Sequence, residues 1–380
     1  MNGASNPPSA VPIPRRRGEL IGIQYLRGLA AMMTVAFHLK SQYLRMGYTG
    51  EWPNGLSSGV DIFFVISGFI MLVTTATKPI TPLMFWWRRI VRIVPLYWLV
   101  TGFMTAVLLI APRLLQTATY DGWHMFASYM FLPAMHPAQN KLEPLVTPGW
   151  TLNYEMFFYL IFGLFLLAPR RLRFAGTVGT IFVLVVAGSV FSPSDKTILG
   201  FYTSSIMFEF ALGMALGEIA LRSDLFTRAP RSLGWVLLIG GLVLLVLQLS
   251  WFGMSPRVLS GPLATSVVAG ALIIETHNHI RNVPLLYALG NASFSIYLTQ
   301  IVVTSALMQA WRHLGLHNWQ GGLTMFAIVD IVACAVVGWL CYRFIERSLT
   351  RFFRPGGLDG ARMRLSGATA QLKKNKQFIR

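Results

Sequence analysis

Apolar stretches of membrane-spanning length recur along the whole chain, separated by short polar or basic segments. The first of them, residues 19–40, has the sequence ELIGIQYLRGLAAMMTVAFHLK. A helix that crosses a bilayer needs about 20 predominantly apolar residues. The pattern therefore predicts an all-α integral membrane protein with ten transmembrane helices, at 19–40, 58–76, 94–113, 150–168, 174–191, 200–221, 233–251, 258–276, 285–309 and 323–345.

Composition supports this class. Hydrophobic residues make up 54% of the 380 residues and charged residues 12%, which is about half the charge of a soluble domain. A formal net charge of +18 would suit a nucleic-acid partner in a soluble protein. In a membrane protein, however, Lys and Arg mark cytoplasmic loops, so we expect no nucleic acid partner.

The distribution of basic residues predicts the orientation. An even number of helices puts both termini on one side of the membrane. With both termini cytoplasmic, the cytoplasmic segments hold 24 Lys and Arg and the external segments 7. We therefore expect a transmembrane domain at 19–349 between a disordered basic tail at 1–18 and a flexible basic tail at 350–380, with membrane lipids as neighbours.

Two ionisable residues lie inside the first predicted helix. Arg27 and His38 are eleven residues apart, which places them on one helix face and about 16 Å apart along the axis. Intramembrane charge is costly, so the pair indicates a polar path through the membrane. Snorkelling of Arg27 to the inner headgroups and hydration of His38 at the outer interface would explain the same residues.

Three acids reach the membrane near the predicted depth of His38. They are Asp61, Glu155 and Asp330, and for Asp330 local pairing is the favoured explanation. An acid beside a histidine can orient the imidazole and stabilise its protonated form. The short loop before the second helix gives Asp61 the shorter route to His38, leaving Glu155 to position an acceptor hydroxyl. Nothing in the sequence fixes the direction of Glu209.

A basic cluster precedes the third predicted helix in MFWWRRIVRIVPLYW. Arg89 and Arg92 are three residues apart, so on a helix both guanidinium groups share one face beside Arg88. Paired arginines suit phosphate, because each can donate two parallel hydrogen bonds. Ordinary attraction to lipid headgroups is the alternative. Coenzyme A, with phosphates at this end and a long pantetheine arm toward His38, would fit both clusters.

Six segments together resemble the acyltransferase-3 family of membrane acyltransferases, and its ExoZ-like branch most. They are the Arg27–His38 pair, GVDIFFVISGF at 59–69, RRIVRIVPLYW at 88–98, WTLNYEMFFYL at 150–160, LGNASFSIYLTQ at 289–300 and YRFIERSL at 342–349. The resemblance implies a ten-helix fold in the bacterial inner membrane, an acyl-CoA donor and acetylation of exopolysaccharide sugars. It further implies His38 as the catalytic base and Arg89 and Arg92 as residues facing CoA.

Two departures from the family pattern bear on the mechanism. Met156 stands where many members have a second acid, and Gln300 where many have histidine. Met156 weakens any mechanism with two carboxylates, and Gln300 favours a mechanism with one histidine. The other histidines lack acids at metal-ligand spacing, so no metal is expected.

Two function classes remain open from the sequence. The first is an O-acyltransferase that moves acetyl from acetyl-CoA to an envelope glycan or its lipid-linked precursor. The second is a transporter or flippase for ions or lipid-linked glycans. Many transporters contain internal repeats, whereas the two halves of this chain show no duplicated pattern. The long external loop at 114–149 is a candidate wall of an acceptor site.

Overall fold

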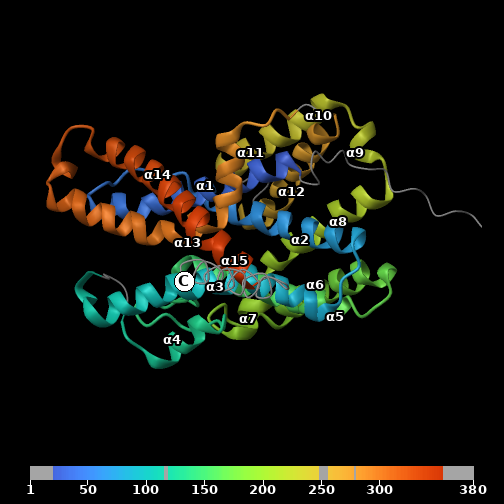
Figure 1. Cartoon of the computed structure of the whole chain (residues 1–380), viewed down its shortest axis with the longest axis horizontal. Coiled ribbons are helices and arrows are strands. Elements are labelled where there is room, and N and C mark those ends of the chain that lie inside the picture. The colour runs from blue at the N-terminus through green and yellow to red at the C-terminus, as the bar shows by residue number, and fades with distance from the viewer. Residues whose placement is uncertain (1–19, 115–118, 248–255, 278–279, 354–380) are drawn as a thin grey trace, which may run out of the picture.

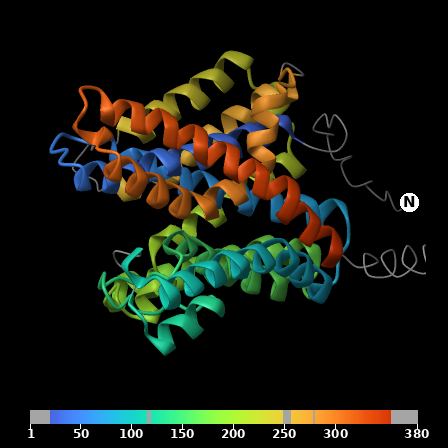
Figure 2. The same cartoon turned by 60° about the vertical axis from the view of Figure 1, so that its left-hand side comes forward.

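The computed structural model describes residues 20–114, 119–247, 256–277 and 280–353. Within these residues the chain is helical and contains no β-strand. Figure 2 shows two layers, with α3 to α7 in one layer and the remaining long helices in the other. The described chain begins and ends at the same end of the molecule, where α1 starts and α15 lies.

The first half of the chain supplies both layers. Its helices are α1 (Ile21–Arg45), η1 (Asn54–Ser58), α2 (Gly59–Thr77), α3 (Pro82–Ile110), η2 (Pro112–Leu114), α4 (Gly122–Tyr129), η3 (Thr147–Gly149), α5 (Trp150–Phe165) and α6 (Arg170–Phe191).

The second half begins with short helices and ends with long ones. They are α7 (Ile198–Tyr202), η4 (Ser205–Met207), α8 (Phe208–Arg222), α9 (Leu225–Arg228), α10 (Arg231–Trp235), η5 (Val236–Gly240), α11 (Gly241–Leu247), α12 (Pro256–Thr276), α13 (Pro284–His313), η7 (Leu316–Asn318), α14 (Gly322–Cys341), η8 (Tyr342–Glu346) and α15 (Arg347–Phe353).

Seven helical segments of the described chain are long and apolar enough to cross a membrane. They contain α2, α3, α6, α7 with α8, α12, α13, and α14 with α15. The other three predicted spans also coincide with helices, but α5 and the α10–α11 segment are shorter than 18 residues, and α1 is not among the seven. Residues 248–251 of the seventh predicted span and almost all of both tails lie outside the described residues.

The third span differs from its predicted bounds. The sequence suggested a basic loop followed by a helix from residue 94, whereas α3 begins at Pro82 and carries Pro95 in its interior. The Thr81 side chain accepts a hydrogen bond from the backbone N–H of Met84, and Pro82 fills the first helical position, which tolerates proline. Arg88, Arg89 and Arg92 are therefore helical.

Glycines allow the helices around the centre to touch backbone to backbone. A Cβ atom at Gly290 of α13 would lie 2.1 Å from the Gln24 carbonyl oxygen of α1. A Cβ atom at Gly213 of α8 would lie 2.0 Å from the Val65 oxygen of α2. Side chains larger than hydrogen cannot enter these contacts, which fix the walls of the central cavity.

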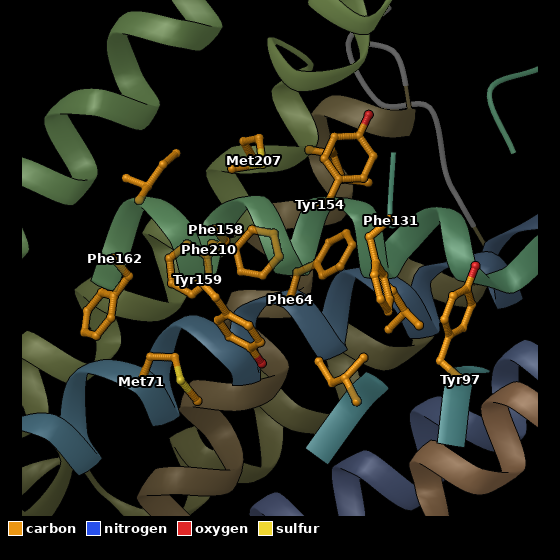
Figure 3. Close-up of a cluster of buried hydrophobic side chains, with 14 of the residues drawn as sticks. Phe64, Met71, Tyr97, Phe131, Tyr154, Phe158, Tyr159, Phe162, Met207 and Phe210 are labelled. Carbon is orange, nitrogen blue, oxygen red and sulfur yellow. The ribbon is translucent and has the colours of Figure 1, made fainter. Parts of the chain in front are cut away.

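An aromatic core joins the two layers (Figure 3). Phe158 of α5 stacks on Phe210 of α8, with ring centroids 4.4 Å apart, and Phe64 of α2 lies 4.5 Å from the same Phe210 ring. These rings are almost completely buried. Since aromatic pairs contribute beyond their buried area, this core holds α5 against α2 and α8.

Candidate active site

A cavity of about 80 Å³ lies between α1, α2, α3, α5 and α13. Its polar lining comes from all five helices and consists of Arg27, Ser67, Arg92, Thr151, Glu155, Tyr159, Ser293 and Tyr297. The hydrophobic remainder of the lining limits water at these charged groups.

Glu155 and Tyr159 form a hydrogen-bonded pair on one face of α5. The residues are four apart, so their side chains are neighbours. The Tyr159 hydroxyl donates to Oε1 of Glu155, and the Ser67 hydroxyl donates to the same oxygen over 3.3 Å. These two donors orient the Glu155 carboxylate in the cavity.

Arg27 reaches the cavity from α1. Its Nη2 donates to the Ser293 hydroxyl over 3.0 Å and its Nη1 to Oε1 of Gln24 over 3.1 Å. Its charge is attracted by Glu155 and Glu346 and repelled by Arg92. Neither acid approaches Arg27 within ion-pair distance in the described chain, so the guanidinium retains capacity for a further anionic partner.

Arg89 packs between two aromatic rings. Its guanidinium carbon lies 5.8 Å from the ring centroids of both Phe85 and Tyr159, which is cation–π distance. Two of its nitrogens, Nε and Nη1, are buried without a hydrogen-bond partner in the described residues. A buried cation with unused donors is costly and is suited to an incoming anion.

Arg92 borders two cavities. It lines the central cavity and also a second cavity with Arg88, Arg89 and Thr350. The predicted phosphate-binding arginines and the intramembrane Arg27 are thus parts of one connected charged region. Four of the predicted site residues, Arg27, Arg89, Arg92 and Glu155, gather around Tyr159.

Glu346 belongs to this region although the sequence did not indicate it. The Ser295 hydroxyl donates to its Oε2 over 2.6 Å, and its charge is attracted by Arg92 and Arg27. Glu346 ends the π-helical turn η8, directly after α14. The available signal was the acid inside YRFIERSL, a segment that carried the family resemblance but was given no role in the site.

His38 lies outside the lining of the central cavity. It is on the face of α1 that carries Arg27, three turns further along, and is partly exposed. Asp61 is buried in the first turn of α2, where the helix dipole favours a carboxylate. No hydrogen bond joins Asp61 to His38 in the described part of the chain, so the predicted pairing of these residues stays a prediction.

Asp330 and Glu209 are not among the residues that line the central cavity. Asp330 accepts a hydrogen bond from the Thr304 hydroxyl over 3.0 Å, as local pairing predicted. Glu209 lies against Gly261 beside an apolar cavity between α6, α8 and α12. Among the described residues there is no group of three His, Cys, Asp or Glu side chains placed to hold a metal.

The segment at 114–149, which was expected to form an external loop, connects to the central cavity. The Tyr97 hydroxyl of α3 donates to the Ser128 carbonyl oxygen, which fixes α4 against α3. At the other end of the segment, the Tyr297 hydroxyl donates to the Pro148 carbonyl oxygen over 2.8 Å. Tyr297 lines the cavity. The segment expected to form the wall of an acceptor site is therefore bonded to a residue of the cavity lining.

The helices and the buried charged cavity define a multi-pass membrane protein with an internal polar site. A family model described as "Acyltransferase domain" matches residues 20–343. The chain belongs to this acyltransferase-3 family of membrane acyltransferases.

Curated relatives agree with the family. The chain is 38% identical to "Exopolysaccharide production protein ExoZ" of Rhizobium meliloti, over 78% of this chain and 90% of that protein. It is 26% identical to "O-acetyltransferase OatA" of Staphylococcus aureus, over 87% of this chain and 57% of that longer protein. "Acyltransferase MdmB" of Streptomyces mycarofaciens is 25% identical over 78% of this chain and 80% of its own length. No solved structure matches the chain significantly.

Proposed function

We propose that this chain transfers an acetyl group from cytoplasmic acetyl-CoA to a sugar hydroxyl of an exopolysaccharide, another envelope glycan or a lipid-linked precursor, in the bacterial inner membrane. The names of ExoZ and OatA support a glycan acceptor and O-acetyl transfer respectively. Arg27, Arg89 and Arg92 are the proposed donor-binding residues, His38 is the proposed catalytic base, and Asp61 and Glu155 are proposed positioning residues.

One observation carries the donor assignment. Arg92 borders both the cavity lined by Arg88 and Arg89 and the central cavity that contains Arg27. The first cavity would hold the nucleotide phosphates of CoA, since arginine forks match phosphate oxygens. The second would guide the pantetheine arm along α1 toward His38, about 16 Å beyond Arg27.

His38 is proposed to act as the general base. Its imidazole takes the proton of the acceptor hydroxyl while the hydroxyl oxygen attacks the thioester carbonyl carbon. The carbon–sulfur bond then breaks, the acetyl group remains on the acceptor oxygen, and the CoA thiolate receives the proton from His38. Asp61 would orient the imidazole through the outer part of α2.

Glu155 is proposed to hold the arginines in place. Its hydrogen bonds to Ser67 and Tyr159 and its attraction to Arg27 support this role. This differs from the acceptor role suggested by its predicted depth.

Transport has no comparable support, because no observation of the cavity favours it over transfer.

The direct experiment is to incubate the purified chain in lipid nanodiscs with acetyl-CoA and glycan from cells that lack this chain. We expect release of free CoA matched by acetyl ester on the glycan. In the double variant Arg89→Lys/Arg92→Lys, charge is kept but the guanidinium forks are lost. The KM for acetyl-CoA should rise about 10-fold, equivalent to about 1.4 kcal/mol.

The matched control is Arg222→Lys/Arg228→Lys. These arginines pair with Glu218 and Asp224 on the surface, so the KM for acetyl-CoA should remain that of the wild type. Acetyl-CoA that stays intact with wild-type protein would reject the proposed reaction. An unchanged KM in the Arg89/Arg92 variant would mean that these arginines bind lipid headgroups and not CoA.

A further inference from the structure

A further charged cavity lies at the opposite end of α13 from Ser293. It is lined by Met308, Gln309, Ala310, Arg312, His313 and His317. Figure 1 shows this end of α13 beside the end of α1, on the left of the view. The cavity is separate from the donor region, which lies around Arg92 and the beginning of α1.

Arg45 adds a further cation from α1. Its guanidinium is close enough to Arg312 for the two positive charges to repel each other. Arg45 also donates to Oε1 of Gln42 over 3.3 Å. Cations from the last turns of two neighbouring helices therefore converge on one place.

No acid neutralises this cluster within the described residues. The ion pairs found there are Arg222 with Glu218 and Arg228 with Asp224, both far along the chain from α1 and α13. Glu51, the acid nearest to Arg45 in the sequence, forms no ion pair with it. Like charges without a counterion are unfavourable, and a bound anion would relieve the repulsion.

Attraction to the helix dipole explains only part of the cluster. Basic residues are favourable in the last turn of a helix, where Arg45, Arg312 and His313 stand. His317, however, comes from the separate turn η7, and its buried Nδ1 has no hydrogen-bond partner in the described chain. Moreover, the cluster contains two of the 7 Lys and Arg expected outside the membrane, where the positive-inside rule makes them sparse.

The position of Arg45 relates the cluster to the proposed reaction. Arg45 follows His38 by seven residues, so it lies on the same face of α1 and about 10 Å further outward. One helix face thus presents Arg27 to the donor, His38 to the reacting atoms and Arg45 to the outer side.

We propose that Arg45, Arg312, His313 and His317 bind an anionic group of the acceptor, a carboxylate or a phosphate, while one of its hydroxyls reaches His38. This inference rests on the proposed transfer reaction. It assigns the acceptor to a chemical class, namely acidic glycans or phosphate-linked glycans.

The test compares two forms of one acceptor in phosphatidylcholine nanodiscs. Glycan from cells lacking this chain is used either native or after carboxyl reduction and phosphate removal. For the native glycan, Arg45→Gln/Arg312→Gln should raise the KM about 10-fold with little change in kcat, and 0.5 M salt should reduce the difference. For the neutralised glycan, wild type and variant should have the same high KM.

The matched control is Arg113→Gln/Lys196→Gln, which removes two exposed cations expected on the same side. Its KM for native glycan should stay at the wild-type value. Equal KM values of the wild type for native and neutralised glycan would overturn the inference. The inference would also be overturned if the effect of Arg45→Gln/Arg312→Gln on KM depended on added phosphatidylglycerol and not on the charge of the acceptor. The cluster would then bind lipid headgroups. Wild-type protein that acetylates neither glycan would instead reject the proposed function itself.

Discussion

Replacing His38 with alanine is expected to lower acetyl transfer by about 10²- to 10⁴-fold, the usual contribution of a general base. The partly exposed side chain forms no hydrogen bond in the described structure, and Phe37 provides its aromatic contact. The variant should therefore fold and insert like the wild type. The measurement is the initial rate of acetyl ester formation on glycan at saturating acetyl-CoA.

The control for this variant is His277→Ala. His277 bonds through its ring to the Ala229 carbonyl oxygen at the end of α12, away from the cavity. Its loss should leave the rate of transfer unchanged. Transfer near the wild-type rate by His38→Ala would remove the base from the mechanism.

Asp61→Asn tests whether Asp61 orients His38. If it does, the acid limb of the pH–rate profile should move to lower pH in this variant, because a neutral amide stabilises imidazolium less than a carboxylate does.

Replacing Glu155 with glutamine is expected to lower kcat/KM for acetyl-CoA by about 100-fold, or about 2.7 kcal/mol. The change removes the carboxylate that attracts Arg27 and accepts hydrogen bonds from Tyr159 and Ser67. Two buried hydroxyl donors would lose the charged acceptor that they bond, and such hydrogen bonds contribute to stability, so the thermal midpoint should also fall. The measurement is acetyl-CoA hydrolysis without acceptor, which isolates the donor side.

Glu218→Gln provides the matched comparison. Glu218 pairs with Arg222 at 2.5 Å, but the arginine side chain is 65% exposed. Surface pairs contribute little, so hydrolysis and thermal midpoint should both remain close to wild type. If Glu155→Gln hydrolysed acetyl-CoA at the normal rate and showed a defect only in transfer to glycan, Glu155 would act on the acceptor and not on the donor.

The helices were largely predictable because apolar runs of membrane length permit few other structures. Their ends were less predictable. Residues 82–93 carry three arginines and were expected to form a loop, yet they continue α3, since an arginine can keep its stem in the helix and its charge at the interface. The number of spans also depends on marginal helices, such as the 16-residue α5.

The site was predictable where helical spacing decides it. Arg89 with Arg92, and Arg27 with His38, share the faces that their spacing requires. Depth estimates from topology were weaker, because they ignore how helices are offset against each other. Glu155 lines the central cavity together with Arg27. His38 and Asp61 were expected at the same depth as Glu155, but neither lines this cavity. Glu346 depends on the contact of η8 with α13, which no local pattern reveals.

The location of the donor tests the central claim most directly. The measurement is an electron cryomicroscopy structure of the full chain in a nanodisc with a thioether analogue of acetyl-CoA, which cannot be cleaved. The account predicts the nucleotide phosphates against Arg88, Arg89 and Arg92, and the acyl end on the face of α1 that carries Arg27 and His38. Nucleotide phosphates bound at the other end of the molecule, beside Arg45 and Arg312, would contradict it.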